Sequence, residues 1–164
     1  MSKKKNLSDY DDAGLPAADK MKIAIVYADW NEEVTSALVG GAKNTLLKHG
    51  LKEKNLIIHS VPGSYELPMG AQYLLINNFD LDAVICIGCV IQGETRHFDF
   101  ISDAVANGVM NVALKYEKPV VFGVLTTNDY AQAKERSGGK HGNKGDEAAF
   151  TAIKMAALRK KLWK

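Results

Sequence analysis

The 164-residue chain lacks long apolar runs and a large excess of charge of either sign. No run reaches the roughly 18 to 20 apolar residues that span a bilayer, and Met1 to Lys20 lacks the apolar core of a secretory signal. We therefore expect a cytoplasmic protein with no membrane partner. Its 21 basic and 19 acidic residues are spread along the chain, a pattern that does not suggest binding to nucleic acid.

Cysteine is scarce as well: Cys86 and Cys89 form a single C-x-x-C motif. Both lie in the apolar run 83–91, which is typical of a buried strand, whereas a redox pair opens a helix whose dipole lowers the thiol pKa. A structural zinc site is not indicated either, because there are four histidines and no second cysteine pair. We expect a fold that depends on neither metal nor disulfide.

Four runs rich in branched apolar residues alternate with helix-like stretches. The runs cover 22–28, 55–61, 83–90 and 119–125. Consecutive apolar residues suit strands covered on both faces, and alternation with helices indicates a parallel sheet. This order predicts an α/β fold, a three-layer α/β/α sandwich with a flavodoxin-like, doubly wound, four-stranded parallel sheet. Ligands of such folds bind beyond the carboxyl ends of the strands.

The same pattern predicts one domain, residues 21–164, after a polar N-terminal arm of residues 1–20 whose composition is typical of a disordered tail. Helices are expected over about 31–49, 66–77, from 96 onward, 130–136 and 145–162. Asn31, Thr95 and the run 126–128 are the expected caps of the first, third and fourth of these helices. The segment 137–145 is a glycine-rich, doubly basic loop.

Polar and aromatic residues follow the first two strands. Trp30 is either a stacking platform for a planar ring or a lid over the core. After the second strand, prolines and Gly63 restrict the backbone, while Ser64 and Glu66 place a hydroxyl and an acceptor at the mouth of the sheet. Alternatively, Ser64 caps a helix and Glu66 interacts with its dipole.

The third strand leads into a loop, Gly88 to His97, that is close to the nucleotide-binding pattern G-x-x-x-x-G-K-[ST]. Glu94 stands where that pattern requires lysine, so ATP or GTP is not indicated. A glycine loop before a helix still presents backbone N–H groups and a positive dipole to a smaller phosphate. His97 lies in the first turn of the helix, where the dipole favours a neutral base, unless it is an ordinary surface residue.

Beyond the fourth strand, Arg136 and Lys144 flank the glycine-rich loop. They could bind an anion, although basic residues in loops are often only solvated.

Taken in order, these segments resemble the lumazine synthase family (6,7-dimethyl-8-ribityllumazine synthase) of riboflavin biosynthesis. The similarity runs from about Met21 to the C-terminus. The matching stretches are Trp30-Asn31, 61–66, 88–97, 122–127, 132–136 and 142–145.

The resemblance implies a transferase without a cofactor. Its reaction condenses 5-amino-6-(D-ribitylamino)uracil with 3,4-dihydroxy-2-butanone 4-phosphate, and phosphate and water are released. His97 matches the catalytic histidine of the family. The residues that match its substrate-binding positions are Trp30, Gly63, Ser64, Tyr65, Glu66, Val90, Ile91, Gly93, Glu94, Thr95, Phe122, Arg136 and Lys144.

The resemblance also implies a role for each of these residues. Trp30 stacks on the pyrimidine, residues 63–66 face the ribityl chain and ring, and the main chain at Val90 and Ile91 contacts the edge of the ring. The loop 93–95 and Arg136 bind phosphate.

The resemblance also implies a homopentamer in which Phe122, Arg136 and Lys144 complete the pocket of a neighbouring subunit. The loop 138–145 resembles that of members whose pentamers form an icosahedral shell. One segment and one residue depart from the family pattern. Residues 1–20 lack the alternating apolar strand that often joins a neighbour's sheet, and Tyr65 stands where Phe is frequent.

Two other functions compete with this one. A catalytically idle lumazine-binding, flavin-binding or shell-forming protein could use the same scaffold. A signalling receiver shares the sandwich but needs clustered acids at the end of the first strand and Asp at the end of the third. Only Asp29 and the Gly88-Cys89 pair stand there.

Overall fold

A four-stranded parallel sheet is the middle layer of the protein. The computed structural model describes residues 14–163, and residues 1–13 of the predicted arm lie outside this range. The sheet order is β2-β1-β3-β4, with β1 (Ile23–Ala28), β2 (Leu56–Val61), β3 (Ala83–Ile91) and β4 (Val120–Thr127).

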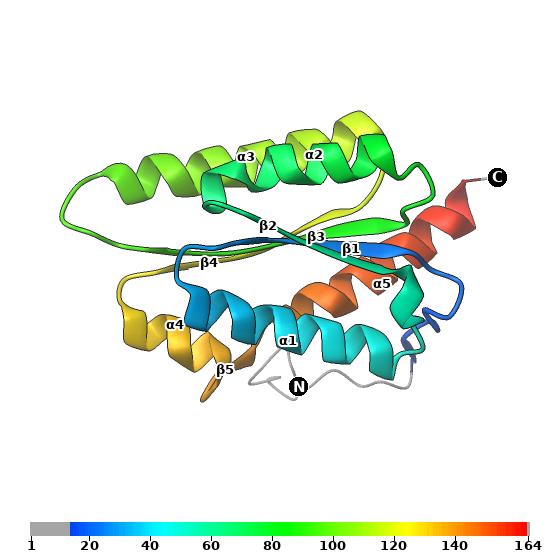
Figure 1. The fold of residues 1–164 in the computed structure, drawn as a ribbon, viewed down its shortest axis with the longest axis horizontal. Helices are drawn as coiled ribbons and strands as arrows, with labels where there is room; N and C mark the ends of the chain where they lie inside the picture. Colours follow the sequence, from blue (N-terminus) through cyan, green and yellow to red (C-terminus); the bar gives the residue numbers. More distant parts are fainter. Residues whose placement is uncertain (1–13, 164) are drawn as a thin grey trace, which may run out of the picture.

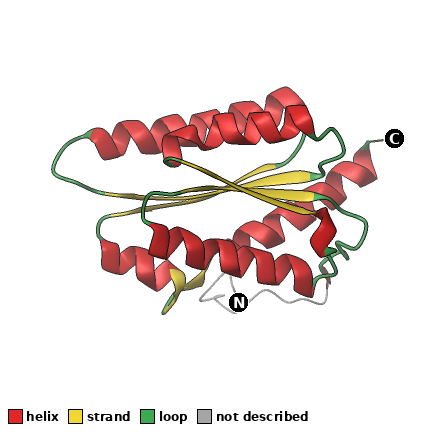
Figure 2. Ribbon diagram, viewed as in Figure 1, coloured by secondary structure: helices red, strands yellow, loops and turns green. Residues whose placement is uncertain are grey.

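Helices cover both faces of this sheet (Figures 1 and 2). One layer holds α2 (Leu67–Asn77) and α3 (His97–Tyr116), and the other holds α1 (Glu32–Lys48), α4 (Tyr130–Arg136) and α5 (Lys144–Leu162). The predicted flavodoxin-like, doubly wound sandwich is confirmed, and each predicted strand and helix is present. Among residues 14–163, no helix combines the length and apolar character needed to cross a membrane.

Two short 3-10 helices and a hairpin complete the structure: η2 (Glu53–Asn55), η3 (Ser64–Glu66), β5 (Ser137–Gly139) and β6 (Gly142–Asn143). The hairpin corrects the prediction of an irregular loop over 137–145. Its strands pair antiparallel, and Gly138 and Gly142 adopt positive φ of 119° and 71°, which glycine reaches without strain.

The predicted helix caps are found only in part. Asn31 occupies the N-cap position of α1, as predicted. The Asn31 side chain makes no capping bond, because its amide donates instead to the carbonyl of Cys89. For α4, the cap is Asp129 rather than the run 126–128, since the Asp129 carboxylate accepts the Gln132 N–H at 2.8 Å. The Thr95 hydroxyl does accept the His97 N–H, at 3.4 Å.

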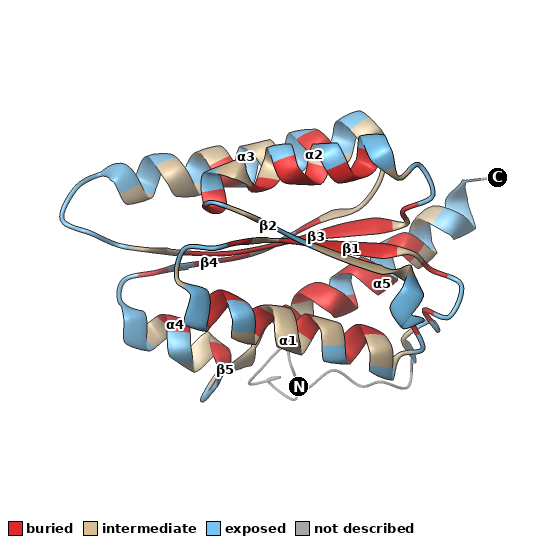
Figure 3. Cartoon of the chain, in the orientation of Figure 1, coloured by how far each residue is buried: buried red, intermediate tan, exposed pale blue. Residues whose placement is uncertain are grey.

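The central strands β1 and β3 are buried on both faces, as their apolar runs predict (Figure 3). For β2 the same prediction is wrong. It lies at one edge of the sheet, where the helices leave His59 and Ser60 exposed. Ala18, inside the predicted arm, is fully buried, and its N–H donates to the His49 carbonyl, so the packed part of the chain begins before Met21.

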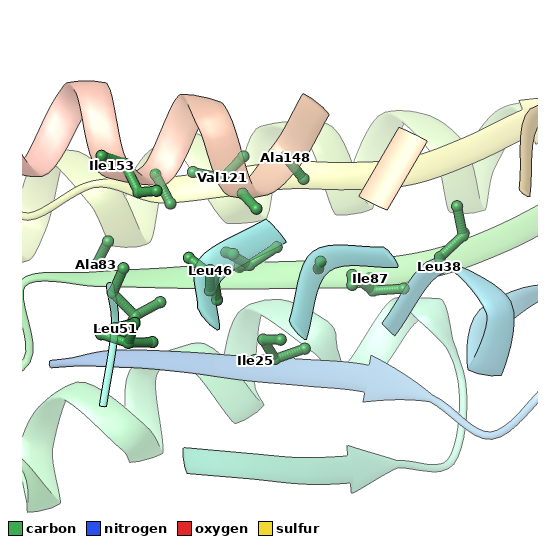
Figure 4. Close-up of a cluster of buried hydrophobic side chains, with 14 of the residues drawn as sticks. Ile25, Leu38, Leu46, Leu51, Ala83, Ile87, Val121, Ala148 and Ile153 are labelled. Atoms are coloured by element: carbon green, nitrogen blue, oxygen red, sulfur yellow. The ribbon is translucent and has the colours of Figure 1, made fainter. Parts of the chain in front are cut away.

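Side chains of the sheet alternate between two apolar clusters, as the pleat requires. The odd-numbered residues Ile25 and Ile87 point toward α1 and α5, where they meet Leu38, Leu46 and Ile153 (Figure 4). The even-numbered residues of β1 and β3 pack against α2 and α3 in the second cluster. The sheet is therefore fixed by apolar contacts on both sides.

The backbones of α1 and α5 approach each other at Gly145. A Cβ at this position would lie 1.9 Å from the Leu38 carbonyl oxygen. Asn143 bridges the same two helices, because its amide nitrogen donates to the Ala37 carbonyl at 2.9 Å and its side-chain oxygen accepts the Gly145 N–H at 2.8 Å. Only glycine fits at this crossing.

This crossing predicts that Gly145→Ala lowers the free energy of unfolding by about 3 kcal/mol, because the backbone of α1 must move. Gly40→Ala is the matched control. A Cβ at Gly40, in the interior of α1, meets nothing within 4 Å, so alanine should stabilise the protein by about 0.5 to 1 kcal/mol. Urea unfolding at one protein concentration measures the free energy of unfolding of both variants. Equal changes in the two variants would contradict the close approach of the helices at Gly145.

Candidate active site

A cavity of about 620 Å³ lies at the carboxyl ends of β1, β2 and β3. This is the switch point of the sheet, where the chain connections leave β1 and β3 in opposite directions, and its volume suits a small-molecule ligand. Its lining residues are Trp30, Asn31, Gly63, Ser64, Tyr65, Glu66, Cys89, Val90, Ile91, His97 and Ile101.

One wall of the cavity consists of an indole and a carboxylate that meet over Gly63. A Cβ at Gly63 would lie 3.4 Å from Cδ1 of Trp30 and 3.1 Å from Oε2 of Glu66. Trp30 is 73% exposed, so it does not act as a lid over the core. An exposed indole at the edge of a cavity is suited to stacking on a planar ring.

Ser64 lies deeper in the cavity and presents a buried hydroxyl. The residue is 7% exposed, and its Oγ has no hydrogen-bond partner among residues 14–163. Gly88 makes room for it, since a Cβ there would lie 2.6 Å from this Oγ. The alternative that Ser64 caps a helix is wrong, because its side chain makes no capping bond. A ligand hydroxyl or carbonyl could satisfy it.

His97 also lines the cavity, as the first residue of α3. The exposed loop 92–96 precedes it and projects past the end of the sheet (Figure 1). The N–H of Gln92 donates to the Thr127 carbonyl at 2.8 Å, which ties the start of this loop to the end of β4. Gly93, Glu94 and Thr95 belong to this loop and do not line the cavity itself.

The three remaining predicted site residues lie elsewhere in the same chain. Arg136 and Lys144 line a separate cavity of about 280 Å³ beside the carboxyl half of β4. Within it the Lys144 ammonium lies 2.6 Å from Oε1 of Glu147, and the Arg136 guanidinium donates to the Gln132 carbonyl at 3.0 Å. Phe122 is 42% exposed on β4.

Phe122 belongs to an apolar groove of about 690 Å³ between α3, β4 and α5. Exposed apolar side chains line it, namely Met110, Leu114, Phe122, Met155, Leu158, Leu162 and Trp163. The outer face of α2, next to the opposite edge of the sheet, carries a second exposed apolar row, Met69, Tyr73 and Ile76, which Phe79 extends beyond the helix. Exposed apolar surface of this extent is typical of interaction sites and ligand-binding grooves.

An ionic cluster joins α1 to α4 near the candidate site. The Glu33 carboxylate accepts hydrogen bonds from the Lys134 ammonium and the Tyr130 hydroxyl. The bond from Lys134, followed by the bond from Tyr130, holds the pKa of Glu33 below its ordinary value. The bond to Glu33 in turn raises the pKa of both Lys134 and Tyr130.

The C-x-x-C motif is structural. Both thiols are free and buried, and burial raises the pKa of Cys86 to about 12 and that of Cys89 to about 11. Within residues 14–163, no group of three or more His, Cys, Asp or Glu residues is arranged to hold a metal ion.

Sequence reasoning missed three residues of the cavity: Asn31, Cys89 and Ile101. From the sequence, Asn31 is expected to cap a helix and Cys89 to lie within a strand. Both interpretations concern local structure, and the contacts that matter here come from other segments of the chain.

Comparison with known proteins identifies the family. Residues 20–160 match the family model described as 6,7-dimethyl-8-ribityllumazine synthase. The protein of that name from Cytophaga hutchinsonii is 57% identical over 153 residues, 93% of this chain and 95% of that protein. Its counterpart in Parabacteroides distasonis is 50% identical over 150 residues, 92% and 93% of the two chains. Its counterpart in Campylobacter concisus is 50% identical over 141 residues, 86% and 90% of the two chains.

The buried thiols predict a dependence of stability on pH. Unfolded cysteine ionises above about pH 8.5, whereas folded Cys86 keeps its proton to about pH 12. The folded state therefore holds more protons, and the free energy of unfolding falls as pH rises from about 8.5 toward 12. Between pH 9 and 10, Cys86→Ala should reduce this fall by up to ~1.4 kcal/mol per pH unit. Urea unfolding at several pH values, with reductant present, measures this dependence. Identical slopes of the unfolding free energy against pH for the native protein and the variant would show that the folded thiol ionises normally.

Proposed function

The chain belongs to the 6,7-dimethyl-8-ribityllumazine synthase family, and we propose that its cavity is one half of an active site that a neighbouring subunit completes. The protein is a transferase of riboflavin biosynthesis. It condenses 5-amino-6-(D-ribitylamino)uracil with 3,4-dihydroxy-2-butanone 4-phosphate to 6,7-dimethyl-8-ribityllumazine, the penultimate step of that pathway, and releases phosphate and water.

The ribitylaminouracil binds in the cavity at the carboxyl ends of β1, β2 and β3. The exposed indole of Trp30 stacks on the pyrimidine, and the main chain of Val90 and Ile91 faces its edge. Residues 63–66 face the ribityl chain, whose hydroxyls can bond to the unpartnered Ser64 Oγ and the Glu66 carboxylate. This subsite is supported by its volume and by the Ser64 hydroxyl, which lacks a hydrogen-bond partner in the described part of the chain.

The phosphate of the second substrate binds at the loop formed by Gly93, Glu94 and Thr95. This loop leads directly into the 20-residue helix α3, whose free N–H groups and positive dipole end favour an anion. Glu94 replaces the lysine of a nucleotide-binding loop, so the positive side chain comes instead from Arg136 of the neighbour. A guanidinium binds phosphate through two parallel hydrogen bonds.

His97 is placed between the two subsites, where proton transfers are required. Attack of the 5-amino group on the ketone gives an imine and releases one water. Elimination of phosphate leaves an enol that tautomerises to a second ketone, and attack of the ribitylamino nitrogen on this ketone closes the ring and releases a second water. Each step moves protons but requires no external electrons, so no redox cofactor is expected. A positioned histidine typically contributes about 100- to 10,000-fold, and alignment of the two substrates supplies a further part.

The second half of the site comes from the opposite edge of the molecule. Phe122, Arg136 and Lys144 do not line the substrate cavity of their own chain, and they cluster along β4, α4 and the start of α5. A head-to-tail contact of the β4 edge with the β2 edge of the next subunit would bring them to that subunit's cavity, and repetition of this contact closes a ring. The exposed apolar surfaces at both edges support this contact, and family membership supports a homopentamer, with a shell of pentamers as the higher assembly.

We also propose that the enzyme works in the cytoplasm. Both cysteines are free, which fits a reducing compartment, and the substrates are polar metabolites.

Mixed assemblies test the shared site. Alone, His97→Ala should lose about 100-fold in kcat, and Arg136→Ala should raise the KM for the phosphorylated ketone about tenfold, because one loses the proton relay and the other a charged hydrogen bond. When the two variants are unfolded together and refolded as mixed rings, about one quarter of the sites receive both native halves. With the phosphorylated ketone held well below its native KM, lumazine fluorescence should then show about a quarter of the native rate, against about a twentieth for the sum of the separately refolded variants.

A mixture that is no faster than the sum of the separately refolded variants would contradict sharing. Lys140→Ala, in the exposed tip of the β5–β6 hairpin, is the control for removal of a positive charge near Arg136 and should keep the native rate. Binding of both substrates by native protein without fluorescence would instead indicate a catalytically idle protein.

The assembly itself is tested at the apolar groove. Leu114 is 68% exposed in the single chain, so Leu114→Asp should leave the fold intact. If the groove is an interface, the buried carboxylate should dissociate the ring. Size exclusion with light scattering should give about 90 kDa for a pentamer of 17.9 kDa chains, or a far larger mass for a shell, and a monomer for the variant. Lys115→Asp, beside it on α3, should keep the native mass.

A further inference from the structure

Asn31 follows the stacking residue Trp30 and has an unusual backbone conformation. Its φ and ψ are 59° and 45°, in the left-handed helical region. Among residues 14–163, Glu117 is the only other residue besides glycine with positive φ. Most side chains are strained in this conformation, and asparagine tolerates it better than most.

The Asn31 side chain does not serve the helix that it precedes. Its Nδ2 donates a hydrogen bond of 2.9 Å to the carbonyl of Cys89, 58 residues further along the chain. In the register of the sheet, Tyr27 lies beside Ile87, and the chain leaves β1 after Ala28. If β1 continued, a backbone N–H of β1 would donate to the Cys89 carbonyl. Because β1 ends at Ala28, the side-chain amide of Asn31 takes the place of that donor.

This hydrogen bond joins two walls of the substrate cavity. On one side, the turn that contains Asn31 carries the indole of Trp30. On the other, Cys89 is followed by Val90 and Ile91, and all three residues line the cavity. We infer that Asn31 is a positioning residue that sets the distance and orientation between the Trp30 ring and the Cys89–Ile91 main chain, and hence the slot for the pyrimidine. This inference rests on the proposed placement of that substrate.

Position 31 requires a residue that tolerates the left-handed conformation and that also has a side-chain hydrogen-bond donor. Asparagine has both properties, whereas glycine and aspartate have only the first. Glycine adopts the left-handed conformation freely but has no side-chain donor. Aspartate has nearly the same shape and also tolerates the conformation, but its ionised carboxylate only accepts hydrogen bonds and would face the Cys89 carbonyl, another acceptor. Asn31→Gly and Asn31→Asp therefore both remove the donor, and the glycine variant does so without backbone strain.

The test is steady-state kinetics with each substrate varied in turn. Both variants should raise the KM for 5-amino-6-(D-ribitylamino)uracil about tenfold. The KM for 3,4-dihydroxy-2-butanone 4-phosphate should stay within about twofold, because its phosphate binds at a loop that Asn31 does not contact, and kcat should stay within about threefold. Glu32→Ala, at the next residue and exposed, should match the native enzyme in all three values.

Circular dichroism and the melting temperature check that the variants are folded and assembled. Native KM values in both variants, or equal rises for both substrates, would overturn the inference while the native enzyme still forms lumazine. Absence of lumazine from the native enzyme would refute the proposed function instead. Because Asn31→Gly relieves backbone strain, it provides a folded variant if Asn31→Asp is unstable.

Discussion

The burial of β1 and β3 on both faces is the constraint on which the rest of the structure depends. Their side chains alternate between two apolar clusters, so the middle of the sheet offers no place for polar chemistry. Polar and aromatic residues occur where the parallel strands end, and those ends meet at one side of the molecule. The doubly wound order then opens a cavity between β1 and β3. The position of the site is thus a consequence of how the core is covered.

The sequence predicted the fold well because its signals were local and repeated. Apolar runs identified the four strands, and the helices followed with boundaries shifted by a residue or two. The errors arose where a residue has a distant partner. Asn31 carries the usual side chain of a cap but bonds to Cys89, and β2 carries an apolar run but lies at an edge where His59 and Ser60 are exposed. No periodicity within one segment reveals either fact.

For the candidate site, the sequence supplied residue types and their order but not their grouping. It indicated an aromatic residue, a hydroxyl and a histidine at successive strand ends, and the structure gathers Trp30, Ser64 and His97 around one cavity. It did not show that Arg136 and Lys144 line a different cavity of the same chain. That separation depends on the strand order, and it supports the shared site that the family resemblance implies. The roles of Gly63 and Gly88 likewise depend on side chains that press on them from other segments.

The two thiols of β3 have a consequence for the chemical robustness of the protein. Oxidation of cysteine proceeds through the exposed thiolate, and both sulfur atoms are buried and held in the protonated form. Reaction of Cys86, which is fully buried, would require β3, a central strand of the sheet, to open, and central strands are typically among the last segments to do so. We therefore expect the part of the cavity wall formed by β3 to keep its structure when the redox state of the surroundings changes, although β3 contains a C-x-x-C motif.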